Sequence, residues 1–88
     1  MASYVLKILN RDRAYYEGEV ASTVLPGGKG SFGVLARHAP LVSTLEAGLC
    51  KARDSAGTLH TWRIGPGLVE TALNRTTLFL DDPPQLAE

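Results

Sequence analysis

Turn-forming residues interrupt this chain so often that a long helix has no room to form. No stretch of about a dozen residues combines helical periodicity with freedom from glycine and proline. Between the turns lie short segments that alternate apolar and polar residues or are rich in β-branched side chains, as strands are. Turn signals about 8–12 residues apart are typical of all-β sandwiches and barrels. The sequence therefore predicts an all-β fold, a β-sandwich of roughly ten strands in two packed sheets.

The turns also set the expected boundaries within the chain. An aromatic strand at residues 15–17 is expected to end at Gly18, and Pro26 to Gly30 is expected to be a loop. Asp54 to Gly57 has the composition of a hairpin turn. We predict a β-sandwich domain over residues 1–82 and a short, loose C-terminal tail over residues 83–88. The expected strands are 3–9, 15–17, 19–25, 31–35, 41–45, 49–53, 58–64, 68–71 and 76–80.

Length, charge and cysteine content limit what the domain does. A domain of 88 residues buries only about 60–65% of its unfolded surface, so a partner surface adds useful stability. The formal net charge is zero, which argues against a nucleic-acid partner. Cys50 is the single cysteine, so no internal disulfide forms, and a reducing compartment is expected.

No segment of the sequence indicates a secretory signal or a membrane span. Residues 1–7 contain no basic stretch followed by an apolar core, and the apolar runs elsewhere are only a few residues long. Any membrane association is therefore expected to run through a partner.

Neither histidine has the neighbours in sequence that catalysis or metal binding needs. His38 stands in a turn, and as a general base it would need a nucleophile or a carboxylate that no motif supplies. A histidine that shapes the loop by bonding to the backbone, or that touches a partner, is the simpler interpretation. His60 and Cys50 fall short of a zinc ligand set. His60 is instead expected to be a strand residue beside Trp62.

Three other patterns resemble binding sites only superficially. The segment from Gly27 to Ser31 lacks the spacing of a phosphate-binding loop, and no helix is expected after it. Adjacent Asp81 and Asp82 lack the further oxygen ligands that calcium requires. The aromatic residues are expected mostly in the core rather than on a nucleic-acid platform. We therefore predict no catalytic residue, no cofactor and no metal site; the glycine-rich segment indicates a protruding hairpin tip that contacts another chain.

The segment from Gly30 to Leu41 has the most tightly specified backbone in the chain. A short apolar strand lies between two glycines, Gly30 and Gly33, and Pro40 fixes its own φ while it holds the preceding residue extended. Gly33 is expected where the strand runs into a turn. With a positive φ there, a Gly33→Val substitution would strain the backbone.

This segment resembles the signature of the epsilon subunit of F-type ATP synthases, in Gly-Ser-Phe-Gly-Val-Leu at 30–35 and His-Ala-Pro-Leu at 38–41. The resemblance covers almost the whole chain, and the ordered set carries it rather than any single piece. It implies a rotor-stalk subunit with a β-sandwich, not an enzyme. The other similar segments are 4–9, 16–20, 45–48, 65–70 (with Pro66 as a departure from a Gly-Gly pair) and 74–81.

The resemblance also implies two partners. In this family the sandwich packs on the gamma subunit and touches the polar loops of the membrane c-ring, so that proton-driven rotation is coupled to ATP synthesis. The implied place is the cytoplasmic face of the bacterial inner membrane or the equivalent organellar face. An inhibitory helical hairpin follows the sandwich in most members; the sequence stops at Glu88, so that hairpin is expected to be absent. The alternative that stays open is a free-standing β-sandwich module that binds a ligand or a protein.

Carried over to this sequence, the resemblance implies two sets of contact residues. Candidates for the ring lie in the glycine-rich tip and the histidine turn, and candidates for gamma lie in the strand that follows. The ring candidates are Gly28, Lys29, Gly30, Ser31, Phe32 and His38, and the gamma candidates are Val42, Ser43 and Thr44.

Overall fold

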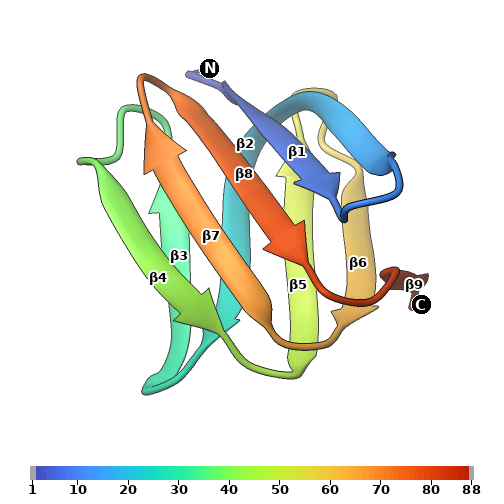
Figure 1. The fold of residues 1–88 in the computed structure, drawn as a ribbon. Coiled ribbons are helices and arrows are strands. Elements are labelled where there is room, and N and C mark those ends of the chain that lie inside the picture. The colour runs from blue at the N-terminus through green and yellow to red at the C-terminus, as the bar shows by residue number, and fades with distance from the viewer. Residues whose placement is uncertain (1, 88) are drawn as a thin grey trace.

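The computed structural model describes residues 2–87, which form nine strands and no helix. The strands lie in two layers that face each other, with the core between them (Figure 1). The predicted all-β sandwich is thus confirmed. The strands are β1 (Tyr4–Leu9), β2 (Ala14–Gly27), β3 (Gly30–Leu35), β4 (Leu41–Leu45), β5 (Gly48–Asp54), β6 (Leu59–Ile64), β7 (Gly67–Ala72), β8 (Arg75–Leu80) and β9 (Gln85–Leu86).

Strand β2 belongs to both layers. Its first half pairs with β1, and its second half pairs with β3 and β5. The register against β5 shifts between Val20 and Ser22, and such a bulge bends a strand at that point. One layer therefore holds β4, β7, β8, β1 and the first half of β2, and the other holds β3, the second half of β2, β5, β6 and β9. The segments expected as separate strands at 15–17 and 19–25 form one strand, β2, and β9 is a strand that was not expected, so nine strands stand where roughly ten were predicted.

The expected break at Gly18 is wrong, because β2 continues through it and Gly18 pairs with Leu6 of β1. Glycine is useful here for space rather than for a turn. A Cβ at position 18 would lie 3.0 Å from the hydroxyl oxygen of Tyr16, whose ring lies over the glycine.

The expected loop from Pro26 to Gly30 is also shorter than predicted. Pro26 and Gly27 still belong to β2, and Gly30 already belongs to β3. Gly27 pairs with Gly30, so Gly28 and Lys29 alone form the connection. Gly30, the first residue after this connection, has a φ of 114°, a conformation that only glycine adopts readily, so the start of β3 specifically requires a glycine.

The core fills the space between the two layers with alternate residues of each strand. Each large apolar side chain that is fully buried contributes about 1.5–3 kcal/mol relative to its exposure to water. Trp62 is 5% exposed and belongs to the core as expected, whereas Phe79 is 42% exposed and does not. The largest fully buried apolar side chains are Leu6, Ile8, Leu25, Leu45 and Leu78.

A buried tyrosine joins the two layers through polar contacts. Tyr4 of β1 is 2% exposed, and its hydroxyl donates to the backbone carbonyl of Val34 in β3 at 2.9 Å. The same hydroxyl is hydrogen-bonded to the hydroxyl of Thr23 in β2. Burial raises the pKa of Tyr4, the Thr23 hydrogen bond opposes that rise, and Cys50 adds to it. The two layers are therefore locked at this point by direction-dependent bonds as well as by apolar packing.

The C-terminal segment is ordered against the sheet, contrary to the expected loose tail. Gln85 and Leu86 form β9, which pairs antiparallel with Arg63 and Trp62 of β6. The backbone N–H of Ala87 then donates to the carbonyl of Thr61 at 2.9 Å. The pairing covers part of the edge of β6 that would otherwise face solvent.

Candidate functional site

The ring candidates 28–31 form the exposed tip of the β2–β3 hairpin, at the end of the sandwich where β4 also ends (Figure 1). The residues after the tip form a strand, so the glycines are not followed by a helix N-terminus. Phe32 lies differently from its neighbours: it is half-buried, packs against the core, and its ring covers Gly27. A Cβ at Gly27 would lie 2.9 Å from that ring.

The structure brings this tip together with two of the gamma candidates. A shallow hollow of about 490 Å³ lies between the hairpin and β4. Its walls are residues 27–32 on one side and Ser43 and Thr44 on the other. Glycines, three hydroxyl residues and the Phe32 ring line the hollow, so more of its wall is apolar than polar, and Lys29 is its one charged side chain. Such a surface suits an uncharged protein segment better than a charged small molecule.

The structure places His38 away from the tip, beyond the opposite end of β3. The six residues of β3 separate them by roughly 20 Å, at about 3.3 Å per residue. The Nδ1 nitrogen of His38 donates to the carbonyl of Ala39 at 2.7 Å, and its backbone N–H donates to the carbonyl of Leu35 at 3.2 Å. These backbone contacts agree with the interpretation of His38 as a loop-shaping residue, and its contact with a partner stays a prediction.

The turn that holds His38 is fixed by a residue from another hairpin. Asn74, between β7 and β8, accepts a hydrogen bond from the backbone N–H of Arg37 at 2.7 Å through its side-chain oxygen. Its side-chain nitrogen donates to the carbonyl of Ser3 at 2.8 Å. Arg37 has a φ of 62° and Asn74 a φ of 60°, so both lie in the left-handed region. This end of the sandwich is therefore rigidly cross-linked, unlike the open tip.

The gamma candidates on β4 do not share one face. Val42 is 68% exposed and Thr44 is also exposed, whereas Ser43 between them points to the other side of the strand. Thr44 pairs with Leu68 of β7, which in turn pairs with Phe79 of β8. Leu68 and Phe79 are both exposed large apolar residues, so an apolar row crosses this outer face. This row was not predicted from the sequence, although the alternation of β7 and β8 places both residues opposite the buried ones.

The Gly33 expectation is wrong. Gly33 lies inside β3, opposite Val24, and it is not among the glycines with positive φ. A Cβ there would meet only the Thr23 carbonyl, at an ordinary 3.8 Å. Nothing within the described chain requires a glycine at this position.

An aromatic hollow on the opposite side of the sandwich also escaped the sequence analysis. The rings of Tyr16 and Trp62 lie 5.0 Å apart in an edge-to-face arrangement, and His60 stacks on Trp62 at 5.8 Å. Sequence spacing gave no signal for it, because the tyrosines and the tail come from separate parts of the chain. The hollow measures about 460 Å³ and is lined by Tyr15, Tyr16, His60, Trp62, Pro84 and Leu86.

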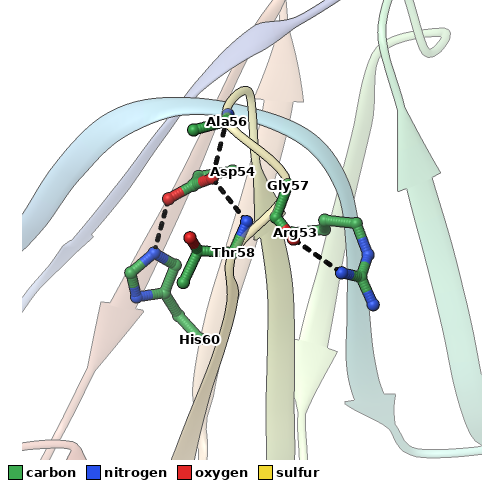
Figure 2. Close-up of polar contacts among 6 residues, drawn as sticks. All are labelled: Arg53, Asp54, Ala56, Gly57, Thr58 and His60. Carbon is green, nitrogen blue, oxygen red and sulfur yellow. Dashed lines mark hydrogen bonds and ion pairs between the residues drawn. The ribbon is translucent and has the colours of Figure 1, made fainter.

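His60 is hydrogen-bonded to Asp54, with 2.9 Å between the imidazole Nε2 and a carboxylate oxygen. Figure 2 shows that the other oxygen of Asp54 accepts from the backbone N–H groups of Ala56 and Thr58 across the β5–β6 turn. The His60 hydrogen bond, followed by the backbone bond from Thr58, lowers the pKa of Asp54. The pair therefore braces the predicted hairpin turn, which also uses Gly57 at a φ of 94°.

The remaining candidates for chemistry among the described residues are the cysteine and possible metal ligands. Cys50 faces the core, and burial raises the pKa of its thiol to about 12, so the nucleophilic thiolate is scarce. No group of three or more His, Cys, Asp or Glu side chains that could hold a metal occurs in residues 2–87. The same range contains no helix long and apolar enough to cross a membrane.

Comparisons with known proteins agree with this architecture. The fold defines a two-layer β-sandwich subunit domain, and residues 3–82 match the profile of the "ATP synthase, Delta/Epsilon chain, beta-sandwich domain". The chain belongs to this family. One similar protein is the ATP synthase epsilon chain of Moorella thermoacetica, which is 43% identical over 92% of this chain and 60% of the relative. Another is the ATP synthase epsilon chain of Dichelobacter nodosus, which is 32% identical over 92% of this chain and 57% of the relative. The chain thus spans about three fifths of the length of these curated relatives.

Solved structures show the same fold. A chain of the Euglena gracilis mitochondrial ATP synthase, in a structure of its OSCP, F1 and c-ring parts, superposes with a TM-score of 0.89 at 19% identity. The match covers 98% of this chain and 54% of that chain. A chain from the central stalk and c-ring structure of the Tetrahymena thermophila mitochondrial enzyme gives a TM-score of 0.72 at 15% identity, over 89% of this chain and 63% of that chain.

Proposed function

We propose that this chain is a non-catalytic part of the central stalk of an F-type ATP synthase. In this proposal it links the gamma subunit to the membrane c-ring, so that proton-driven ring rotation reaches the catalytic head. The observation that carries the proposal is the family match over residues 3–82, together with a sandwich that ends in a protruding polar tip. The proposed place is the cytoplasmic face of a bacterial inner membrane, or the equivalent organellar face, reached through partners alone.

The candidate surface for the ring is polar and the candidate surface for gamma is partly apolar, which suits two partners of different chemistry. The tip at Gly28 to Ser31 is exposed and polar, which suits the polar loops of a ring that carries many equivalent contacts. The outer face of β4 and β7 exposes Val42 and Leu68, and apolar surface of this kind is stabilised by permanent burial against one partner. A torque-bearing link needs a stiff body, and the Tyr4 bonds between the layers supply part of that stiffness.

A charge placed on the tip tests the ring contact. We expect Ser31→Arg to change the free energy of unfolding by less than about 0.5 kcal/mol, because Ser31 is exposed and its side chain makes no hydrogen bond within residues 2–87. In reconstituted membranes the same variant should weaken proton-coupled ATP synthesis, since interface rims respond to misplaced charge. Hydrolysis by the detached catalytic head should not change.

A matched control lies at the other end of the sandwich. Ser55 is exposed in the β5–β6 turn, so Ser55→Arg adds the same charge far from the tip and should leave synthesis at the wild-type rate. Equal synthesis by the two variants would move the ring contact away from the tip. Unfolding of Ser31→Arg alone would show instead that the tip is structural.

The aromatic hollow supports one alternative function. Its volume of about 460 Å³ falls within the usual range of small-molecule sites, and Tyr16, His60 and Trp62 provide ring faces. A free-standing ligand- or protein-binding module would use it without other subunits. Co-purification separates the alternatives, because a stalk component is recovered with gamma and c subunits and a free-standing module is not.

A further inference from the structure

The strand β3 is an open sheet edge. It pairs with β2 alone among the strands of the described chain, and it forms the left-hand edge of the rear layer in Figure 1. The edge at the other end of this layer is different, because β6 is partly covered there by β9. An open edge presents unpaired backbone groups, which template the addition of another strand.

The register determines which backbone groups of β3 point outward. Pro26 has no N–H and its carbonyl accepts from Glu46 on the side away from β3, at 2.8 Å. Since the direction of the backbone groups alternates along a strand, Leu25 and Gly27 face β3. Their partners are Phe32 and Gly30, so the backbone groups of Ser31, Gly33 and Leu35 point to the free edge.

This edge carries none of the devices that normally block strand addition. Residues 30–35 include no charged side chain and no proline, and their register against β2 has no bulge. The centre of the edge is Gly33, whose presence nothing within the described chain requires. A glycine within a strand often marks a place where another backbone approaches closely.

We propose that β3 accepts an extended, uncharged segment of the gamma subunit as an added strand, paired through the backbone groups of Gly33 and the N–H of Leu35, so that the tip at Gly28 to Ser31 stays free for the ring. This inference rests on the proposed stalk function and specifies how gamma is held. The gamma candidates Ser43 and Thr44 border the same side of the sandwich, across the hollow that Ser31 and Phe32 also line. Strand addition gives a stiff joint, because successive outward-facing residues lie only about 6.6 Å apart along the edge.

The chemistry of the partner segment follows from charge. Neither β3 nor β4 contains an aspartate, glutamate, lysine or arginine. A charged side chain buried beside residues 30–35 would lose hydration, and Lys29 at the tip is the one charged side chain that lines the adjoining hollow, so an opposite charge is available at one point at most. The bound segment is therefore composed of uncharged residues that favour an extended backbone.

Amide hydrogen exchange, measured by NMR on the free chain and on its complex with gamma, tests the inference directly. In the free chain the amides of Gly33 and Leu35 should exchange fast, and those of Phe32 and Val34, bonded within the sheet, should exchange slowly. In the complex the amides of Gly33 and Leu35 should exchange at least about tenfold more slowly, as expected when a hydrogen bond forms. Phe32 and Val34 serve as internal controls.

Proline substitution provides a second measurement. Gly33→Pro removes an outward N–H without removing a bond to β2, and Gly33→Ala keeps that N–H. We expect Gly33→Pro to weaken gamma binding by about tenfold or more, with an unchanged circular dichroism spectrum, and Gly33→Ala to weaken it less. If Gly33→Pro fails to fold, the exchange measurement still decides.

The outcomes separate this inference from the function on which it rests. Gamma binding with the amides of Gly33 and Leu35 unprotected overturns the strand pairing and leaves the stalk function intact. Absence of gamma binding overturns the stalk function and the pairing together. Protection that appears in the isolated chain as its concentration rises shows pairing between two copies and overturns gamma as the occupant.

Discussion

The bond network of Tyr4 provides the sharpest test of how the two layers are held together. Tyr4→Phe removes one hydroxyl and leaves two buried groups short of a partner, the hydroxyl of Thr23 and the carbonyl of Val34. A buried polar group without its partner costs about 1–3 kcal/mol. Val34 keeps its pairing with Thr23 in the β2–β3 ladder, so the hydroxyl of Thr23 carries most of the cost. We expect Tyr4→Phe to lower the free energy of unfolding by about 2 kcal/mol.

The measurement is thermal and urea denaturation of the wild type and four variants. For a domain of this size, about 2 kcal/mol corresponds to a fall in Tm of about 8–16 °C. Thr23→Val should cost less than Tyr4→Phe, because the hydroxyl of Tyr4 still donates to Val34. The double variant should cost less than the two single variants together, since neither unpartnered hydroxyl remains. Tyr15→Phe is the matched control, because Tyr15 is only half-buried and its hydroxyl accepts a single long bond of 3.3 Å from Asn10.

Two results would refute this reasoning. A change below about 0.5 kcal/mol for Tyr4→Phe, the size usual for a surface position, would mean that the network contributes no net stability. Strict additivity of the Tyr4 and Thr23 variants would mean that the two hydroxyls act independently, despite the contact between them.

Three further predictions concern pH and glycine. Because the pKa of Asp54 is lowered in the folded chain, its carboxylate contributes stability above the unfolded value of about 3.9, and this stability is lost as pH falls through the folded value. Asp54→Asn should therefore flatten the dependence of Tm on pH between about 5 and 2. The same slope of Tm against pH in the variant and the wild type would contradict this. Because the pKa of Cys50 is raised to about 12, the contribution of the buried thiol to stability is fully present below about pH 8.5 and is lost as pH rises toward 12. Cys50→Ala should therefore lose less stability at alkaline pH than the wild type. The native thiol should also resist thiol reagents at neutral pH. A Cβ at Gly67 would lie 2.3 Å from the carbonyl of Phe79, so Gly67→Ala should destabilise the chain by about 1–3 kcal/mol, whereas Gly33→Ala should be near neutral in denaturation; equal effects would refute the geometric argument.

The sequence predicts the strands well wherever alternation and turn residues agree. The strand that carries His60, Trp62 and Ile64 on its inner side, and the turn from Asp54 to Gly57, follow from local pattern alone. Local signals fail where a long-range contact decides. Gly18 predicts the end of a strand, yet it pairs with Leu6 and the strand continues through it. Glycine has two distinct uses, conformational freedom and space, and the sequence does not tell which one applies.

The tail and the candidate site show the same limit. Nothing local in Gln85 and Leu86 indicates a strand; the open edge of β6, formed by a distant segment, supplies the pairing. The exposure of the tip at Gly28 to Ser31 was predictable, because a segment of glycines around a lysine has little apolar surface to bury. Its distance from His38 was not, because that distance depends on whether the residues between them are extended or folded back.

The separation of the tip from His38 limits the possible orientations of the sandwich relative to the ring. Residues roughly 20 Å apart at opposite ends of β3 do not both reach the loops of one flat ring surface. If the tip meets the ring, His38 faces away from the membrane. Photo-crosslinkers attached at Ser31→Cys and His38→Cys test this, and the buried thiol of Cys50 leaves the new cysteine as the reactive one. We expect a product with the c subunit from position 31 and none from position 38. A c-subunit product from both positions would mean that the ring wraps along β3 rather than meeting one end of it, and the strand addition proposed for gamma would then have no free edge to use.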